Sequence, residues 1–108
     1  MNARTPPLRK PPRSQADLLH PILLKTFVVV AESGSFTKAA ERLKVTQPAV
    51  SQRVGRLEAA TQRTLVVRRT PKLRLTEHGS AMLSFARTIL AAQDEATEHF
   101  KITKERDQ

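Results

Sequence analysis

Apolar residues recur at helical spacing in the first half of the chain, and capping residues divide this pattern into short segments. Pro21 suits the first turn of a helix, where its missing N–H costs nothing. Ser33-Gly34 can end that helix, because glycine readily takes the left-handed conformation of a C-cap. The apolar side chains between these signals lie three and four residues apart, as on one face of an amphipathic helix: Leu23, Leu24, Phe27, Val30 and Ala31.

Two further helices are predicted downstream, separated by a short turn at Lys44-Val45. Ser35 can cap the second helix, which ends at Leu43, and Thr46 can cap the third. Gln47-Pro48 places a proline in the first turn of the third helix, where it is tolerated. The predicted buried face of this helix consists of Val50, Val54 and Leu57. Two short helices joined by a tight turn form the helix-turn-helix pattern.

A basic hairpin is predicted after the third helix. Thr64–Arg68 is rich in β-branched residues, Thr70-Pro71-Lys72 favours a turn, and Leu73–Leu75 alternates as a second strand. A hairpin with many cations and no acid is typical of a wing that binds the phosphate backbone. Its cations are Arg63, Arg68, Arg69, Lys72 and Arg74.

The whole chain is therefore predicted to be mainly α and to divide into four parts. Residues 17–76 form a compact unit of three helices and a two-stranded β wing, the wing spanning about 64–75. Thr76 can cap a long helix over 77–101, which is followed by a charged, frayed end over 102–108. Residues 1–16 hold four prolines and four basic residues and are predicted to be a disordered basic arm, because such a stretch cannot bury a core.

The charge is unevenly distributed along the chain. Nineteen Lys and Arg against ten Asp and Glu give a formal net charge of +9. Fifteen basic and four acidic residues lie at or before Arg74, whereas four basic and six acidic residues follow it. This asymmetry favours a polyanion such as nucleic acid as the partner of the first part. The alternative is a soluble protein with a merely cationic surface.

Several function classes find no support in the residues. The chain has no cysteine, which excludes disulfides, thiolate zinc sites and thiol nucleophiles, and fits a reducing, cytoplasmic compartment. No apolar run approaches the roughly 20 residues of a membrane helix. His20, His78 and His99 lie in separate segments, so no catalytic grouping is formed. Glu95 and His99 are interpreted as a surface pair rather than a metal site. We therefore expect no enzyme activity, cofactor or metal.

The outward face of the third helix is polar and carries no acid. The stretch from Leu43 to Leu57 contains no Asp or Glu. Side chains of the types present reach base edges and phosphates in a major groove. The alternative is a three-helix bundle whose third helix is simply solvated. The residues of this face are Gln47, Ser51, Gln52, Arg53 and Arg56.

These motifs together resemble the amino-terminal domain of LysR-type transcriptional regulators. The resemblance is ungapped from about Leu23 to Leu90. It implies a winged helix-turn-helix, with the motif at about 36–55, that binds specific sequences in double-stranded DNA. The segments that carry it are Ser35–Leu43, Val45–Ser51, Leu57-Glu58, and Leu73–Glu77 with Gly79.

The resemblance also implies roles for individual residues. The predicted base-reading residues are Gln47, Pro48, Ala49, Ser51 and Gln52. The contacts to the DNA backbone that the resemblance implies are Ser35, Thr37 and Arg53 in the helix-turn-helix, with Arg68 and Arg69 on the wing. Thr46, Arg56 and Lys72 are further candidates for backbone contacts.

The chain departs from the family pattern at a few places. Family members usually have Leu-Gly where Thr61-Gln62 stands, and a Phe and an acid in the wing where Val66 and Val67 stand. Gly55 is unusual inside a helix, where glycine costs about 1 kcal/mol relative to alanine. Family members also continue into a large domain that senses a small effector, and we expect no such domain in these 108 residues. An excised domain and a natural stand-alone domain are both compatible with the sequence.

The long helix carries a candidate seam for dimerisation. Its apolar positions alternate by three and four residues, as at the a and d positions of a coiled coil. The resemblance implies a linker helix that pairs in a homodimer, which would hold two recognition helices roughly 34 Å apart. The alternative is that the first of these residues cover the core of their own domain. The seam residues are Met82, Phe85, Ile89, Ala92 and Ala96, followed by His99.

The sequence thus predicts a dimeric, sequence-specific DNA-binding domain of a transcription regulator. Two alternatives belong to other classes. One is a general nucleic-acid or nucleoid binder, in which the arm and the wing supply nearly all the affinity. The other is a protein-interaction module that uses the winged fold and the seam helix.

Overall fold

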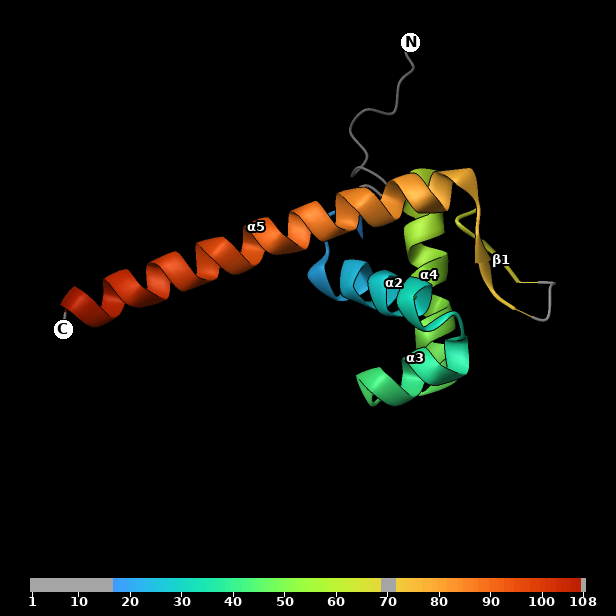
Figure 1. The fold of residues 1–108 in the computed structure, drawn as a ribbon, viewed down its shortest axis with the longest axis horizontal. Coiled ribbons are helices and arrows are strands. Elements are labelled where there is room, and N and C mark those ends of the chain that lie inside the picture. The colour runs from blue at the N-terminus through green and yellow to red at the C-terminus, as the bar shows by residue number, and fades with distance from the viewer. Residues whose placement is uncertain (1–16, 69–71, 108) are drawn as a thin grey trace, which may run out of the picture.

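The computed structural model describes residues 17–68 and 72–107, with side chains as far as Lys101. The predicted arm (1–16), Arg69 of the predicted wing, and Thr70 and Pro71 of the predicted turn lie outside the described residues. Within the described ranges the elements follow in the order α2 (Pro21–Ser33), α3 (Phe36–Leu43), α4 (Gln47–Thr61), β1 (Val66–Val67), β2 (Arg74–Leu75) and α5 (Glu77–Asp107) (Figure 1).

Local capping explains where α2 begins and ends. Pro21 opens the helix as predicted, and the His20 ring accepts a hydrogen bond at Nδ1 from the backbone N–H of Ile22 at 3.3 Å. Gly34 ends the helix with a φ of 68°, and its N–H donates to the carbonyl of Val30 at 2.9 Å. Glycine adopts this conformation without steric cost, so the predicted stop at Ser33-Gly34 is confirmed.

Side-chain caps fix the starts of α3 and α4, and a short turn joins the two helices. Ser35 Oγ accepts from the N–H of Lys38 at 3.1 Å, and Thr46 Oγ1 accepts from the N–H of Ala49 at 3.2 Å. Lys44 ends α3 in the left-handed conformation, with a φ of 58°. The N–H of Val45 donates to the carbonyl of Ala40 at 3.0 Å. Both caps were predicted, and α3, the turn and α4 form the helix-turn-helix.

α4 ends at Thr61 with a residue that is poorly suited to its conformation. Gln62 has a φ of 57°, and its N–H donates to the carbonyl of Ala59 at 3.3 Å. This is the position where the LysR pattern has glycine. A side chain in the left-handed region crowds the following carbonyl, so the helix keeps its stop at a cost in stability.

The core lies between α2, α3, α4 and the first part of α5. The predicted buried face of α4 is confirmed, since Val50, Val54 and Leu57 are fully buried. Side chains from the other elements complete the core, namely Leu23, Leu24, Phe27, Val30, Ala39, Leu65, Met82 and Ala86.

The wing is a two-stranded antiparallel sheet in which Val66 pairs with Leu75 and Val67 with Arg74. The strands are shorter than the predicted 64–68 and 73–75. Polar groups near the base of the wing have partners outside the ladder: the N–H of Leu65 donates to Glu58, and the carbonyl of Thr64 accepts from the Thr76 hydroxyl at 2.6 Å. The paired residues are confined to Val66–Val67 and Arg74–Leu75, with one further backbone hydrogen bond below them, from the Thr76 N–H to the Leu65 carbonyl.

α5 starts where predicted but runs further. Thr76 Oγ1 caps the helix by accepting from the N–H of Gly79 at 2.9 Å. The helix continues to Asp107, so the prediction of a frayed end from residue 102 is wrong as far as 107. The physical reason is local, because residues 102–107 include Lys, Glu and Arg, which favour helices, and no Gly or Pro.

The start of α5 is packed tightly against the segment that leads into β1. The N–H of Thr76 donates to the carbonyl of Leu65 at 2.9 Å. A Cβ at Gly79 would overlap that same carbonyl oxygen, so glycine is required there for close approach.

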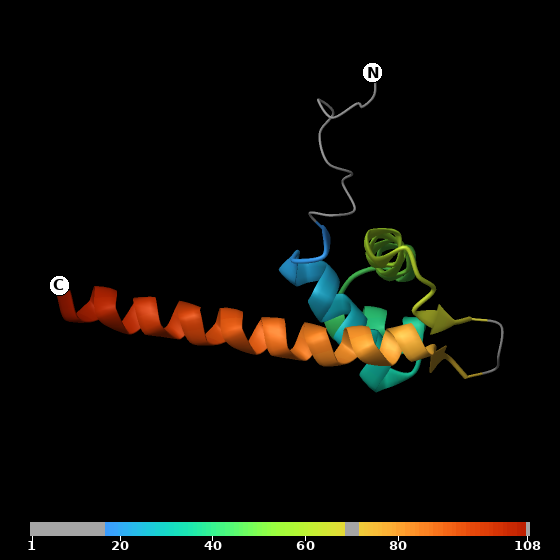
Figure 2. The same cartoon turned by 90° about the horizontal axis from the view of Figure 1, so that it is seen from above.

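The remainder of α5 extends beyond the packed helices. Figure 2 shows α5 lying along the other helices at its start and then projecting away from them to the C-terminus. None of the helices within residues 17–68 and 72–107 combines the length and apolarity of a bilayer span.

Candidate nucleic-acid interface

The solvent-facing side of α4 carries most of the predicted base-reading residues. Gln47, Pro48 and Gln52 are exposed, whereas Ala49 and Ser51 are half-buried. The fully buried Val50, Val54 and Leu57 turn the opposite side of the helix to the core. Because a helix repeats every 3.6 residues, this arrangement leaves a continuous polar strip along α4, and Thr46 is exposed at its start.

Arg68, at the end of β1, reaches across to α4 and α3. One guanidinium nitrogen, Nη1, donates to Ser51 Oγ at 3.2 Å, and Nη2 lies 3.3 Å from Glu58 Oε1. The Cζ atom lies 4.9 Å from the centre of the Phe36 ring, within the range of a cation–π contact. These three contacts hold a positive charge at the border between α4 and the wing.

Glu58 is the residue through which α4 and the wing are joined. Its Oε2 accepts from the N–H of Leu65 at 2.8 Å and from the N–H of Val66 at 3.3 Å, while Oε1 pairs with Arg68. Glu58 belongs to the Leu57-Glu58 segment of the family resemblance, but no role was predicted for it from the sequence. Its isolation was the available signal, because it is the first acid after a long acid-free stretch.

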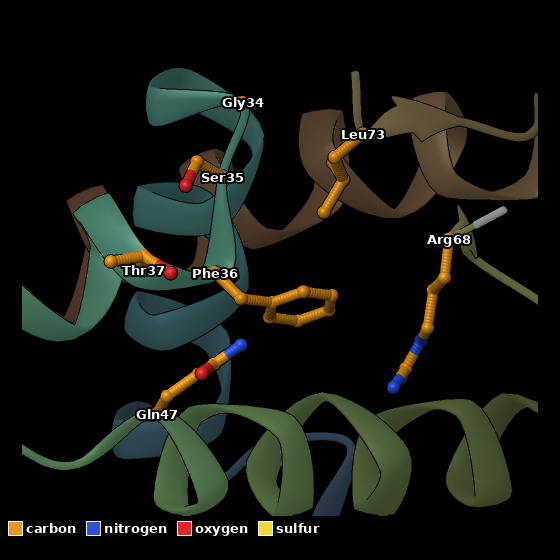
Figure 3. A pocket seen from close by; sticks show the side chains of 7 residues that line it. All are labelled: Gly34, Ser35, Phe36, Thr37, Gln47, Arg68 and Leu73. Atoms are coloured by element: carbon orange, nitrogen blue, oxygen red, sulfur yellow. The ribbon is translucent and has the colours of Figure 1, made fainter. Parts of the chain in front are cut away.

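A cavity lies between the start of α3, the start of α4 and the wing. In Figure 3 the Phe36 ring lies between the Gln47 amide and the Arg68 guanidinium. The exposed Thr37 and the capping Ser35 are at its α3 edge. The structure therefore brings residues from three predicted segments together around one opening, which is lined by Gly34, Ser35, Phe36, Thr37, Gln47, Arg68 and Leu73.

Two arginines predicted to contact a DNA backbone have partners within the protein. Arg53 Nη1 donates to Thr26 Oγ1 at 3.2 Å. Arg56 pairs with both carboxylate oxygens of Asp17, Nε at 3.1 Å and Nη2 at 2.7 Å. Asp17 is buried, and its hydrogen bond with Arg56 raises the pKa of that guanidinium above its ordinary value. Spacing along the helix could not reveal these partners, which lie on other segments.

The predicted wing cations are placed only in part. Lys72 is exposed at the start of the second described segment, and Arg69 lies outside the described residues. Their roles in DNA binding stay predictions.

The candidate seam on α5 divides into two groups. Met82 is buried in the core of its own domain, and Ile89 packs partly against that core. Assigning Met82 to a dimer seam is therefore wrong for this structure. Met82 and Ile89, seven residues apart, lie along one edge of the apolar stripe, and this edge faces the core, whereas Phe85 lies about 60° away around the helix. Phe85 is 63% exposed, and Ala92 and Ala96 are exposed as well.

The described parts of the chain hold no cluster of potential metal ligands. Within them, no three His, Asp or Glu side chains are close enough to share a metal ion. Besides the Glu58 carboxylate, which is bonded to Leu65, Val66 and Arg68, the polar groups described at α4 and the wing include amides, hydroxyls and guanidinium groups, which bind by hydrogen bonding and charge.

Comparison with known proteins assigns the family. The model of the lysR family of bacterial regulatory helix-turn-helix proteins matches residues 22–80. A curated relative, an HTH-type transcriptional regulator in the ibpB-leuC intergenic region of Azotobacter vinelandii, is 47% identical over 72 residues, which cover 67% of this chain and 50% of that protein. The chain spans half or less of the length of the first curated relatives that it matches.

Solved structures agree with this assignment. The BenM DNA-binding domain in complex with catB site 1 DNA superposes with a TM-score of 0.76 at 29% identity, over 79% of this chain and 96% of that chain. Vibrio fischeri DarR in complex with DNA gives a TM-score of 0.77 at 30% identity, over 80% of this chain and 30% of that chain. The fold is thus a winged helix-turn-helix DNA-binding domain. The chain belongs to the LysR family of bacterial transcriptional regulators.

Proposed function

We propose that this domain binds specific sequences in double-stranded DNA as part of a LysR-type transcription regulator that acts in the cytoplasm. The observation that carries the proposal is the polar strip of α4, with Gln47 and Gln52 exposed and Arg68 held at its border. Side-chain amides can pair with base edges in the major groove, and guanidinium groups can bind phosphates or the edge of guanine. The BenM and DarR structures, which share the fold, are themselves DNA complexes.

The cavity beside Phe36 suggests how α4 is oriented on the duplex. A phosphate at its opening would meet the hydroxyl of Thr37 and the guanidinium of Arg68, on opposite sides of the Phe36 ring. Contacts from both sides would fix the start of α4 relative to the backbone. Gln47, at the same edge, would then face the bases.

We further propose that α5 pairs with a second copy through Phe85, Ala92 and Ala96. An exposed phenylalanine followed by small residues along one side of a projecting helix supports this arrangement. Pairing would bury Phe85, which the domain itself leaves in solvent, and apolar burial favours association. A dimer would present two copies of α4 to successive major grooves, roughly 34 Å apart.

Selection from a random pool of duplexes, followed by affinity measurements at physiological salt, tests the proposal. We expect the selected duplex to bind at least about 10³-fold more tightly than a scrambled one. Gln47→Ala should change the selected sequence at particular positions, whereas Glu41→Gln, on the exposed side of α3, should select the same site. Equal affinity for all duplexes would favour the general nucleic-acid binder. Failure to bind any duplex would favour the protein-interaction module.

A further inference from the structure

Gly55 lies inside α4, in a position where the backbone does not require glycine. Among the described residues, Gly34 is the glycine with a positive φ, so Gly55 has ordinary helical geometry. Glycine is among the least favourable residues in a helix interior. The chain therefore accepts a loss of stability at Gly55 without a conformational reason.

Packing does not require glycine at this position either. A Cβ built on Gly55 meets no atom of the described residues within 4 Å. The contrast with Gly79 is direct, because a Cβ there would overlap the carbonyl oxygen of Leu65. The fold itself has room for a side chain at Gly55.

The position of Gly55 on the helix indicates why a side chain is absent there. Residues three and four apart are neighbours on a helix surface, so Gly55 adjoins Ser51, Gln52 and Ala59. Gln52 and Ala59 are exposed, and Ser51 and Gln52 are predicted base-reading residues. Gly55 thus continues the polar strip of α4, one turn beyond the predicted base contacts.

A helix in a major groove leaves little space on either side. The groove is about 12 Å wide, and a helix with its side chains is about 10–12 Å across. A side chain on the face that enters the groove must therefore pair with the DNA or hold the helix away from it.

We propose that Gly55 is the point at which the backbone of α4 comes into direct contact with DNA, against the sugar-phosphate wall of the groove. Its missing side chain sets the depth and tilt of α4, and hence the reach of Gln47 and Gln52 to the bases. This inference rests on the proposed function and adds a residue that determines affinity without making a polar contact.

The test uses the full chain with Gly55→Ala and Gly55→Gln, and Ala91→Gln on the exposed side of α5 as the matched control for added bulk. Thermal unfolding and affinity for the selected duplex are measured for each. We expect Gly55→Ala to raise Tm by about 4–8 °C while weakening DNA binding at least tenfold. Gly55→Gln should bind more weakly still, and Ala91→Gln should bind as the unchanged chain does.

A higher Tm together with a lower affinity for DNA would indicate that a substitution at Gly55 disturbs a DNA contact and does not damage the fold. If both Gly55 variants bind the selected duplex as tightly as the unchanged chain, the inference about Gly55 is overturned while the proposed function stands. If the unchanged chain shows no preference among duplexes, the proposed function itself fails before any variant is compared.

Discussion

Glu58 in α4 accepts a hydrogen bond from the backbone N–H of Leu65 at 2.8 Å. Leu65 is buried and leads directly into the wing, so a carboxylate on α4 satisfies a buried donor at the base of the wing. The same carboxylate pairs with Arg68 through its other oxygen. The helix and the wing therefore share one acidic group and keep a defined relative position.

Replacing Glu58 should destabilise the fold. Glu58→Ala removes the acceptor of the Leu65 N–H, and a buried donor left without a partner costs about 1–3 kcal/mol. Urea unfolding monitored by circular dichroism measures the change in free energy. Glu41→Ala, an exposed acid on α3, is the control and should change stability by less than about 0.5 kcal/mol. Equal effects of the two substitutions would contradict the role assigned to Glu58.

The salt dependence of DNA binding should report on Arg68. Each phosphate contact contributes about −0.9 to the slope of log affinity against log salt. Arg68→Gln should therefore make the slope shallower by about one contact. Arg87→Gln, which removes an arginine paired with Glu32 at 3.1 Å on another part of the surface, should leave the slope unchanged.

Deleting residues 1–16 should also flatten the slope without changing the preferred sequence. A slope near zero in the intact chain would exclude binding through phosphates.

Two substitutions on α5 should separate the domain core from the dimer contact. Phe85→Glu places a charge on an exposed site, so the domain should stay folded and sediment as a monomer, with weaker DNA binding. Met82→Glu places an unpaired charge in the core, which is costly to bury, and the chain should unfold. Circular dichroism and sedimentation velocity measure both properties. A folded Phe85→Glu chain that remains dimeric would argue against pairing through Phe85.

The cap of α4 offers a stabilising substitution. Gln62 holds a φ of 57°, a region that costs a residue with a side chain roughly 1–2 kcal/mol. Gln62→Gly should therefore stabilise the domain by about 1 kcal/mol, and thermal unfolding should show a higher Tm. Gln62→Ala keeps a Cβ and should give no such gain. If alanine and glycine raise Tm equally, the gain does not arise from the backbone conformation.

The features predicted from the sequence are those decided by neighbouring residues. The caps at Ser35, Thr46 and Thr76 and the stop at Gly34 depend on contacts within four residues. Such contacts can be inferred from residue types and spacing alone. The buried face of α4 follows in the same way from its apolar spacing.

The features that were missed depend on segments that are distant in the chain. Arg56 has its partner 39 residues away at Asp17, and Arg53 has its partner 27 residues away at Thr26. Met82 is buried because α5 packs against other helices, whereas its spacing fits the seam equally well. Helical spacing shows which residues share a face, but not what that face contacts.

α5 is a long helix that is joined to the base of the wing at its first turn. α5 has 31 residues, which corresponds to about 46 Å at a rise of 1.5 Å per residue. Its first turn is fixed to Leu65 by the Thr76 hydrogen bond and by the close packing of Gly79. Met82 and Ala86 are also buried in the core, and Ile89 and Leu90 pack against it, so α5 is anchored over its first turns as well as at the wing. The part after Leu90 is an arm of about 26 Å, and a force on its far end acts on the core and the wing together.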